Sequence, residues 1–215
     1  MKKYITAHEA ASMVKEGMTI MIGGFLVNGS PIKIIDELVK INVKNIKLIC
    51  NDTAFPDRGI GKLIANHQIS KLITSHIGTN PSTIEQLNNK EIEIEFIPQG
   101  TLIERIRCGG AGLGGILTPT GLGTIVENGK QKVIVNGKEY LIETALRADI
   151  AFVGASLSDE EGNLVHKGTS QNFNPLMASA ADIVVAEANE YVKTGKIEME
   201  NIHTPAIFVD YLVKK

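Results

Sequence analysis

The chain has 215 residues, with 22 lysines and arginines against 24 aspartates and glutamates, and a formal net charge of −2. This balance excludes a protein that holds nucleic acid mainly by charge, because no basic surplus exists to displace counterions from phosphates. Two cysteines, Cys50 and Cys108, supply neither a disulfide framework nor a metal-ligand cluster. With 43% hydrophobic and 21% charged residues, the composition is that of a globular protein that needs no metal to form its core.

The sequence also argues against a membrane protein. Its longest apolar stretches fall well short of the ~20 residues that a membrane-spanning helix needs. Residues 1–9 turn polar too early for a secretory signal, so we expect a cytoplasmic protein with no membrane contact. Glycine is frequent, with 21 residues, which favours loops whose backbone approaches a ligand closely.

The first half of the chain alternates between helical and extended patterns. Thr6 and Glu9 form a capping box, and Ser30 before Pro31 is typical of a helix N-cap. Helices are expected at 6–15, 31–40, 60–66 and 83–89, and strands at 18–22, 46–50, 70–75 and 92–97. This rhythm predicts βαβ units in a parallel sheet with right-handed crossovers.

The second half interrupts this rhythm and then resumes it. Residues 108–123 are so rich in glycine that we expect a long loop with no helix or strand running through it. Asn136 and Gly137 join two alternating runs within 132–142, the pattern of a type I′ β-hairpin. Further strands are expected at 148–154 and 181–187, with a helix at 173–180 between them. The whole chain, 1–215, is therefore predicted to be a single α/β domain: an open, largely parallel sheet flanked by helices, with a hairpin insertion.

The first candidate site is the glycine-rich turn after the first long strand. It comprises Gly23, Gly24, Phe25, Leu26, Val27, Asn28 and Gly29. A turn of this kind before a helix presents backbone N–H groups to anions in α/β folds. The spacing matches neither the dinucleotide fingerprint nor the P-loop, and a turn that needs glycine only for its geometry is an equally good interpretation.

The other candidates are weaker. The glycines of 109–115 could close over a substrate and offer N–H groups to an oxyanion, or could simply form a bend. His76, His166 and His203 each lie near a strand end, Cys108 adjoins the glycines, and Glu127 precedes a turn. A structural role is the commoner explanation for each, and no histidine pair has zinc spacing. The residues therefore predict a binding site lined by backbone, with no clear nucleophile in this chain and no metal.

Several long motifs, in order, carry a resemblance to a known family. They are EGMTIMIGGFLVNGSP (16–31), NDTA (51–54), SHIGTNP (75–81), PQGTLIE (98–104), RCGGAGLGG (107–115), TPTGLGT (118–124), RAD (147–149), NFNP (172–175) and AADI (180–183). The chain resembles, over almost its whole length, the A (alpha) subunits of family I CoA-transferases, in the acetate, butyrate and acetoacetate branch. Glu16 departs from the signature, which usually has Asp or Asn there.

The resemblance implies an open α/β fold and a partner B (beta) subunit, commonly in an A2B2 heterotetramer. The family moves CoA from an acyl-CoA to a free carboxylate, with coenzyme A as a substrate and no tightly bound cofactor. It implies a glutamate nucleophile on the B subunit, which passes through an acyl-glutamyl anhydride and a glutamyl-CoA thioester. Residues 23–29 are then the CoA-binding segment, 109–112 a loop over the active site, and Glu127 only a superficial match to the nucleophile.

Two other interpretations stay open at this stage. The chain could be a self-sufficient sugar-phosphate isomerase or ligand-sensing domain of the same broad fold, which would carry its own acid and base. It could also be a pure assembly subunit whose glycine loops serve only the structure.

Overall fold

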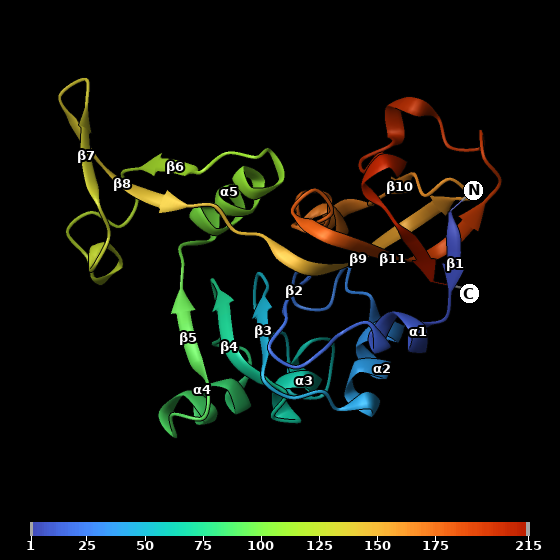
Figure 1. The fold of residues 1–215 in the computed structure, drawn as a ribbon, viewed down its shortest axis with the longest axis horizontal. Helices are drawn as coiled ribbons and strands as arrows, with labels where there is room; N and C mark the ends of the chain where they lie inside the picture. The colour runs from blue at the N-terminus through green and yellow to red at the C-terminus, as the bar shows by residue number, and fades with distance from the viewer. Residues whose placement is uncertain (1, 214–215) are drawn as a thin grey trace.

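Nine strands form the main sheet of the computed structural model, which describes residues 2–213 (Figure 1). Along the sheet their order is β1-β12-β11-β9-β2-β3-β4-β5, and β10 pairs with β9 beside this path. All pairs along the path are parallel, and β10 is antiparallel to β9. The strands are β1 (Lys3–Ile5), β2 (Thr19–Ile22), β3 (Ile46–Ile49), β4 (Ile69–Thr74), β5 (Glu93–Phe96), β9 (Ala148–Asp159), β10 (Leu164–Val165), β11 (Ala181–Val192) and β12 (Tyr211–Val213).

Helices cover both faces of this sheet, which confirms the predicted fold class. Ile20 and Met21 are consecutive in β2 and point to opposite faces, and each belongs to a different apolar core. Leu38 of α2 packs in the core of Ile20, and Leu102 of α5 packs in the core of Met21. The helices are α1 (Ala7–Ser12), α2 (Ile32–Ile41), α3 (Gly61–Ala65), α4 (Pro81–Asn88), α5 (Gln99–Gly110) and α6 (Asn174–Met177), with 3-10 turns η1 (Ile125–Glu127), η2 (Gly168–Gln171), η3 (Met199–Asn201) and η4 (Ala206–Phe208).

The chain leaves the middle of the sheet in two directions. From β2 it builds outward through β3, β4 and β5, and from β9 it builds the opposite way through β11 and β12. In an open α/β sheet, ligands bind outside the carboxyl ends of the strands where the direction switches. That point lies between β2 and β9, and β2 leads directly into residues 23–29.

A second, three-stranded sheet projects from the main body. It contains β6 (Gly115–Thr118), β7 (Lys132–Val135) and β8 (Lys138–Thr144), in the order β6-β8-β7. Asn136 and Gly137 have φ values of 51° and 74°, and Val135 pairs with Lys138. Two consecutive positive φ values across a two-residue loop confirm the predicted type I′ hairpin.

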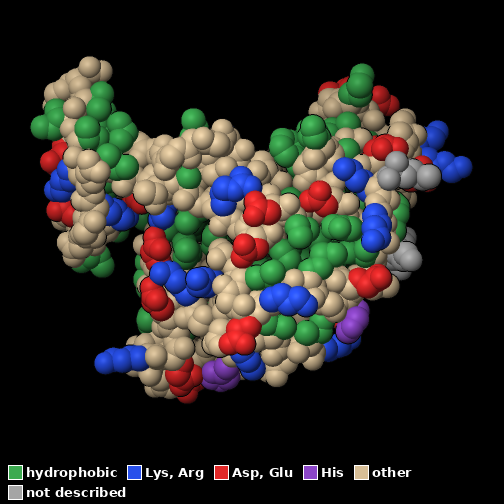
Figure 2. Space-filling model, viewed as in Figure 1, with side chains coloured by type: hydrophobic (Ala, Val, Ile, Leu, Met, Phe, Trp, Pro, Cys, Tyr) green, Lys and Arg blue, Asp and Glu red, His purple; other side chains and the backbone are tan. Residues whose placement is uncertain are grey.

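Hydrophobic side chains gather on this projecting sheet and its loops (Figure 2). Ile125 is 86% exposed and Ile134 is 72% exposed, and Leu117 and Val135 are also exposed. Exposed apolar side chains gathered in this way commonly mark a contact with another protein.

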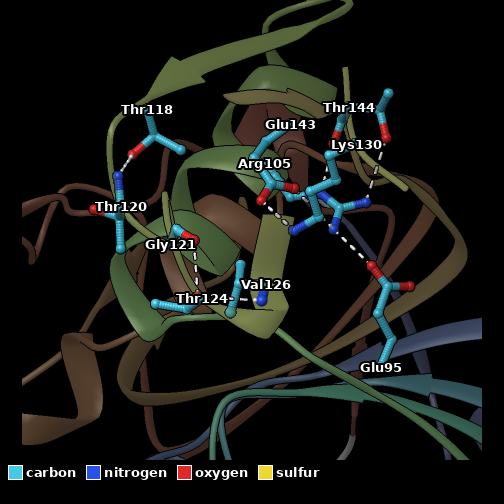
Figure 3. Close-up of polar contacts among 10 residues, drawn as sticks. All are labelled: Glu95, Arg105, Thr118, Thr120, Gly121, Thr124, Val126, Lys130, Glu143 and Thr144. Carbon is cyan, nitrogen blue, oxygen red and sulfur yellow. Dashed lines mark hydrogen bonds and ion pairs between the residues drawn. The ribbon is translucent and has the colours of Figure 1, made fainter. Parts of the chain in front are cut away.

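A buried charge cluster joins the projecting sheet to α5 (Figure 3). Arg105 donates from Nε to the carbonyl of Thr144 at 2.6 Å and from Nη1 to Glu95 at 2.8 Å. Glu143 is 2% exposed and accepts from Lys130, and its other oxygen lies 3.6 Å from Nη1 of Arg105. Because each charge has a partner of opposite sign, the cluster can remain buried at the junction.

The long loop expected at 108–123 is wrong in part. Residues 108–110 complete helix α5, and Gly115–Thr118 forms β6. A Cβ on Gly109 would lie 1.9 Å from the carbonyl oxygen of Leu146, and one on Gly110 would lie 2.1 Å from Oγ of Ser179. These glycines therefore allow the helix to pack closely against neighbouring backbone, and they do not break it.

Other predicted elements differ in detail. Helix α2 has Pro31 at its N-cap position without a side-chain cap, so the predicted cap at Ser30 is wrong. The carboxylate of Glu187 from β11 instead accepts from the N–H groups of Lys33 and Ile34, at 3.1 and 3.0 Å. The strands expected at 148–154 and 181–187 continue further, and the helix expected at 173–180 is the single turn of α6.

Candidate active site at the switch point

Residues 23–29 form a tight turn at the carboxyl end of β2, as the glycine pattern predicted. Gly23 N–H donates to the carbonyl of Phe152 in β9 at 3.0 Å, which fixes the loop to the switch point. Phe25 and Asn28 then exchange N–H···O bonds of 3.0 and 2.9 Å across the turn. Leu26 lies in this turn with φ at 55°, a conformation that a leucine rarely adopts.

Two asparagines that follow the η2 turn hold one side of the loop. Asn174 is fully buried, donates from Nδ2 to the carbonyl of Gly29 at 3.0 Å and accepts from Gly154 N–H at 3.0 Å. Asn172 accepts from Gly24 N–H at 3.3 Å and donates to the carbonyl of Asn28 at 3.2 Å. Sequence reasoning placed both asparagines in a family motif but assigned them no role.

Asp52 holds the other side of the loop. It follows β3, is 3% exposed, and accepts from Leu26 N–H on Oδ2 at 2.9 Å. Its Oδ1 accepts from Ala54 N–H at 2.8 Å, and Asn51 Nδ2 donates to Oδ2 at 2.7 Å. The only sequence signal for this role is the position of an aspartate directly after a buried strand that neighbours the glycine-rich turn.

Most N–H groups of the loop are thus already used within the protein. Among the contacts of residues 2–213, the backbone N–H groups of Val27 and Gly29 donate to no partner. Both residues line a hollow of about 210 Å³ that also contains Ser30, whose buried Oγ has no hydrogen-bond partner among the described residues. These donors are the part of the loop that remains available to a ligand.

A larger cavity of about 450 Å³ opens on the other side of the loop. Its lining comes from the carboxyl ends of β2, β3 and β4 and from the start of α5: Phe25, Leu26, Asn51, Asp52, Ser75, His76, Thr79 and Gln99. Gln99 Nε2 donates to Asn51 Oδ1 at 2.7 Å, and Ser75 Oγ donates to the carbonyl of Asn51 at 2.6 Å. Asn51 and Asp52 are the buried residues of this lining, whereas Phe25, His76 and Gln99 are exposed.

Asp52 is the carboxylate that lines this cavity, and it is poorly suited to attack a substrate. Both of its oxygens accept hydrogen bonds from the protein, three in all. Such donors stabilise the charge and reduce its availability as a nucleophile.

The other predicted candidates lie elsewhere. Glu127 ends the η1 turn between β6 and β7, where its carboxylate accepts from Gly123 N–H and pairs with Lys132, and these contacts lower its pKa. Cys108 is buried within α5. Burial lowers the pKa of His166 to about 4, and both of its ring nitrogens have partners, in Gly154 and Thr204.

Residues 109–112 were expected to form a loop, and this is wrong for their first half. The first two are helical, and Gly112, with φ at 70°, ends the helix. Leu113 N–H donates to the carbonyl of Cys108 at 2.9 Å and Gly112 N–H to that of Gly109 at 3.4 Å, which is a Schellman C-cap.

No helix among the described residues is long and apolar enough to span a membrane.

Comparison with curated proteins gives close relatives. The chain is 54% identical over 213 residues to the acetoacetyl-CoA:acetate/butyrate CoA transferase alpha subunit of Clostridium acetobutylicum, covering 99% of this chain and 98% of that protein. It is 48% identical to the alpha subunit of the acetate CoA-transferase of Escherichia coli, covering 98% and 96%. It is also 43% identical to the corresponding chain of the succinyl-CoA:3-ketoacid coenzyme A transferase of Helicobacter pylori, covering 100% and 93%.

Solved structures share the fold. An acyl-CoA transferase from Escherichia coli O157:H7, in a thioester complex with CoA, superposes with a TM-score of 0.88 at 22% identity. The alignment covers all of this chain but 47% of that one, so this chain spans about half of its length. The glutaconate coenzyme A-transferase of Acidaminococcus fermentans gives a TM-score of 0.86 at 14% identity, covering 98% and 75%. The coenzyme A transferase family model matches residues 4–215, and with the relatives above this shows that the chain belongs to the coenzyme A transferase family, as a family I alpha-type subunit.

Proposed function

We propose that this chain, with a B subunit, moves CoA from a short-chain acyl-CoA (acetoacetyl-, butyryl- or acetyl-CoA) to a free carboxylate. Its 54% identity over nearly the full length to an acetoacetyl-CoA:acetate/butyrate transferase alpha subunit is the observation that carries this substrate class. The A2B2 heterotetramer is the assembly we infer. The cytoplasm is the compartment we infer, since it keeps free thiols such as those of Cys50 and Cys108 reduced.

The proposed reaction alternates between two substrates. A glutamate of the B subunit uses its carboxylate to attack the thioester carbonyl, and CoA leaves as thiolate to give an acyl-glutamyl anhydride. The thiolate then attacks the glutamyl carbonyl, which releases the first acid as its carboxylate and leaves CoA bound to the glutamate as a thioester. The acceptor carboxylate then attacks the glutamyl-CoA thioester, which releases CoA as thiolate and forms a second anhydride. The thiolate attacks the acyl carbonyl of this anhydride, which gives the new acyl-CoA and frees the glutamate, so one difficult exchange becomes several easier ones.

Two features of this chain support a nucleophile from a partner. The carboxylate of Asp52 in the 450 Å³ cavity is already bonded to three N–H donors of this chain. The apolar surface of the projecting sheet, with Ile125 and Ile134 largely exposed, suits a subunit contact. A closed interface at the cavity would also exclude water, which would otherwise hydrolyse the anhydride.

Residues 23–29 are the segment that we propose binds CoA. The free N–H groups of Val27 and Gly29 would donate to amide oxygens of CoA in the 210 Å³ hollow, away from the reacting thioester. Phe25, which is 39% exposed, offers an apolar wall at the mouth of the 450 Å³ cavity. Glycine substitutions cannot test this role cleanly, because Gly24 has a φ of 140° and a Cβ there would lie 2.2 Å from Ser30 Oγ, so the substitution would strain the loop itself.

The test is turnover of acetoacetyl-CoA with acetate, followed by absorbance, for this chain alone and together with its co-purified B partner. We expect activity only in the mixture. Full activity of this chain alone would refute a nucleophile from the partner, and no activity in either sample would refute the substrate class.

A matched pair of variants tests the CoA-binding segment. Phe25→Ala removes a side chain from the cavity, whereas Phe55→Ala makes the same truncation in the next turn, outside the residues that line it. We expect the KM for acetoacetyl-CoA to rise in Phe25→Ala and to stay unchanged in Phe55→Ala. An equal change of KM in the two variants would argue against CoA binding by residues 23–29.

A further inference from the structure

We infer that Asp52 is a positioning residue for the transfer reaction: its carboxylate sets the conformation of the Leu26 turn, and so the wall of the cavity that receives the acyl-CoA. This inference rests on the proposed function. The role is distinct from nucleophilic attack, because Asp52 would act through the loop that it holds.

The contacts of Asp52 link two loops that follow neighbouring strands. One oxygen accepts from Leu26 N–H in the loop after β2, and the other accepts from Ala54 N–H in the loop after β3. Asn51 Nδ2 adds a third donor, and Asn51 is itself bonded to Gln99 at the start of α5. The buried Asp52 side chain thereby ties together the loops after β2 and β3, and its neighbour Asn51 extends the link to α5.

The two loops need a fixing contact because each contains a residue with a strained backbone conformation. Leu26 and Ala54 have φ values of 55° and 50°, in a region that residues other than glycine, asparagine and aspartate seldom occupy. Strained residues of this kind persist only where surrounding contacts fix them. The amides of both residues donate to the same carboxylate, so Asp52 is the contact that the two strained positions share.

A second turn of the same kind follows β3, and it provides an aspartate that does not hold a loop. Phe55 and Arg58 form a turn like that of Phe25 and Asn28, with an isolated bridge between the first and fourth residues. Asp57 in this second turn is 76% exposed at its side chain and pairs only loosely with Arg58, at 3.5 Å. Asp57 is therefore a matched control for Asp52: the same residue type, close in sequence, without the tether.

The substitution Asp52→Asn removes the remote contact and keeps the local one. An asparagine has one acceptor oxygen, which the Ala54 N–H two residues further on can retain as an Asx turn. In this orientation its amide group would face both the N–H of Leu26 and Nδ2 of Asn51, which are donors too, so neither of these hydrogen bonds forms. The variant should fold, but its Leu26 turn should lose the fixed conformation.

The experiment compares wild type, Asp52→Asn and Asp57→Asn, each assembled with the B partner, using acetoacetyl-CoA and acetate. We expect the KM for acetoacetyl-CoA to rise about 10- to 100-fold in Asp52→Asn, the range of a lost hydrogen bond to a charged group, with a smaller change in kcat. Asp57→Asn should stay within about twofold of wild type, as for an exposed pair. A KM that stays at the wild-type value in Asp52→Asn, even with a lower melting temperature, would overturn the inference and leave Asp52 a purely structural residue.

Amide hydrogen exchange, resolved to single residues, provides a second measurement on the same proteins. In wild type we expect the Leu26 amide to exchange more slowly than the amide of Val27, and the difference to vanish in Asp52→Asn. Equal rates at the two positions in wild type would refute the tether whether or not the variant folds. If wild type fails to turn over acetoacetyl-CoA, the proposed function fails, and the exchange of Leu26 alone decides whether the tether exists.

Discussion

The buried charge cluster at the base of the projecting sheet makes a quantitative prediction. Glu143→Gln keeps the size of the side chain but leaves Lys130 and Arg105 without a buried carboxylate (Figure 3). Breaking a fully buried ion pair costs ~3–5 kcal/mol. The loss here should be smaller, about 2–3 kcal/mol, because Lys130 is 22% exposed and Arg105 retains its contact with Glu95.

Thermal unfolding followed by circular dichroism measures this loss. For a chain of this length, a loss of about 2–3 kcal/mol corresponds to a melting temperature lower by roughly 4–12 °C. Glu95→Gln is the control, because Glu95 is 37% exposed and pairs with the same Arg105, and exposed pairs contribute about 0–1 kcal/mol. Equal melting temperatures for the two variants would refute the argument that burial of Glu143 makes its contacts strong.

Three further predictions concern stability. The pKa of His166 is about 4 in the folded chain, below its ordinary value of 6.5, mainly because of burial. The unfolded chain therefore binds a proton at His166 before the folded chain does, so stability is full above pH 6.5 and falls as pH drops toward 4. Urea unfolding should therefore show wild type losing about 2 kcal/mol between pH 7 and pH 5 that His166→Gln does not lose, and parallel pH profiles would contradict this. Glu187→Ala removes the cap of α2 and should cost about 1 kcal/mol in the same assay; an unchanged midpoint would show that the cap contributes nothing. Gly61→Ala places a Cβ 1.8 Å from the carbonyl oxygen of Phe55 and should cost about 1–3 kcal/mol, whereas Gly100→Ala, which meets nothing within 4 Å, should not destabilise, and equal losses would refute the steric argument.

Local patterns predicted the parallel sheet well. Strands such as β2 and β3 are short apolar runs bounded by turns, and burial on both faces requires that composition. The hairpin at Asn136 and Gly137 was predictable because its turn type needs two positive φ values in succession. Strands β1 and β12, at the sheet edge beside the chain ends, were not predicted, because three residues are too short a run to carry a pattern.

Packing between distant segments was not predictable from local sequence. Gly109 and Gly110 looked like loop residues, yet they lie in a helix, at positions where Leu146 and Ser179 leave no room for a Cβ and glycine is needed for close packing. Ser30 looked like a helix cap, yet Glu187, more than a hundred residues further on, takes that role. In both cases a long-range contact overrides the local preference.

The glycine-rich turn shows why its location could be predicted and its mechanism could not. Glycines between a buried strand and a helix correctly indicated a turn at the carboxyl edge of the sheet, where the chain direction switches. The sequence also led us to expect free N–H donors along this turn. Several of them are occupied, because Asp52 accepts from Leu26 N–H and Asn172 accepts from Gly24 N–H. If the loop binds CoA as proposed, it does so with few free donors in a shape that polar side chains from β3 and the η2 turn impose. Specificity would then depend as much on Asp52 and Asn172 as on the glycines themselves.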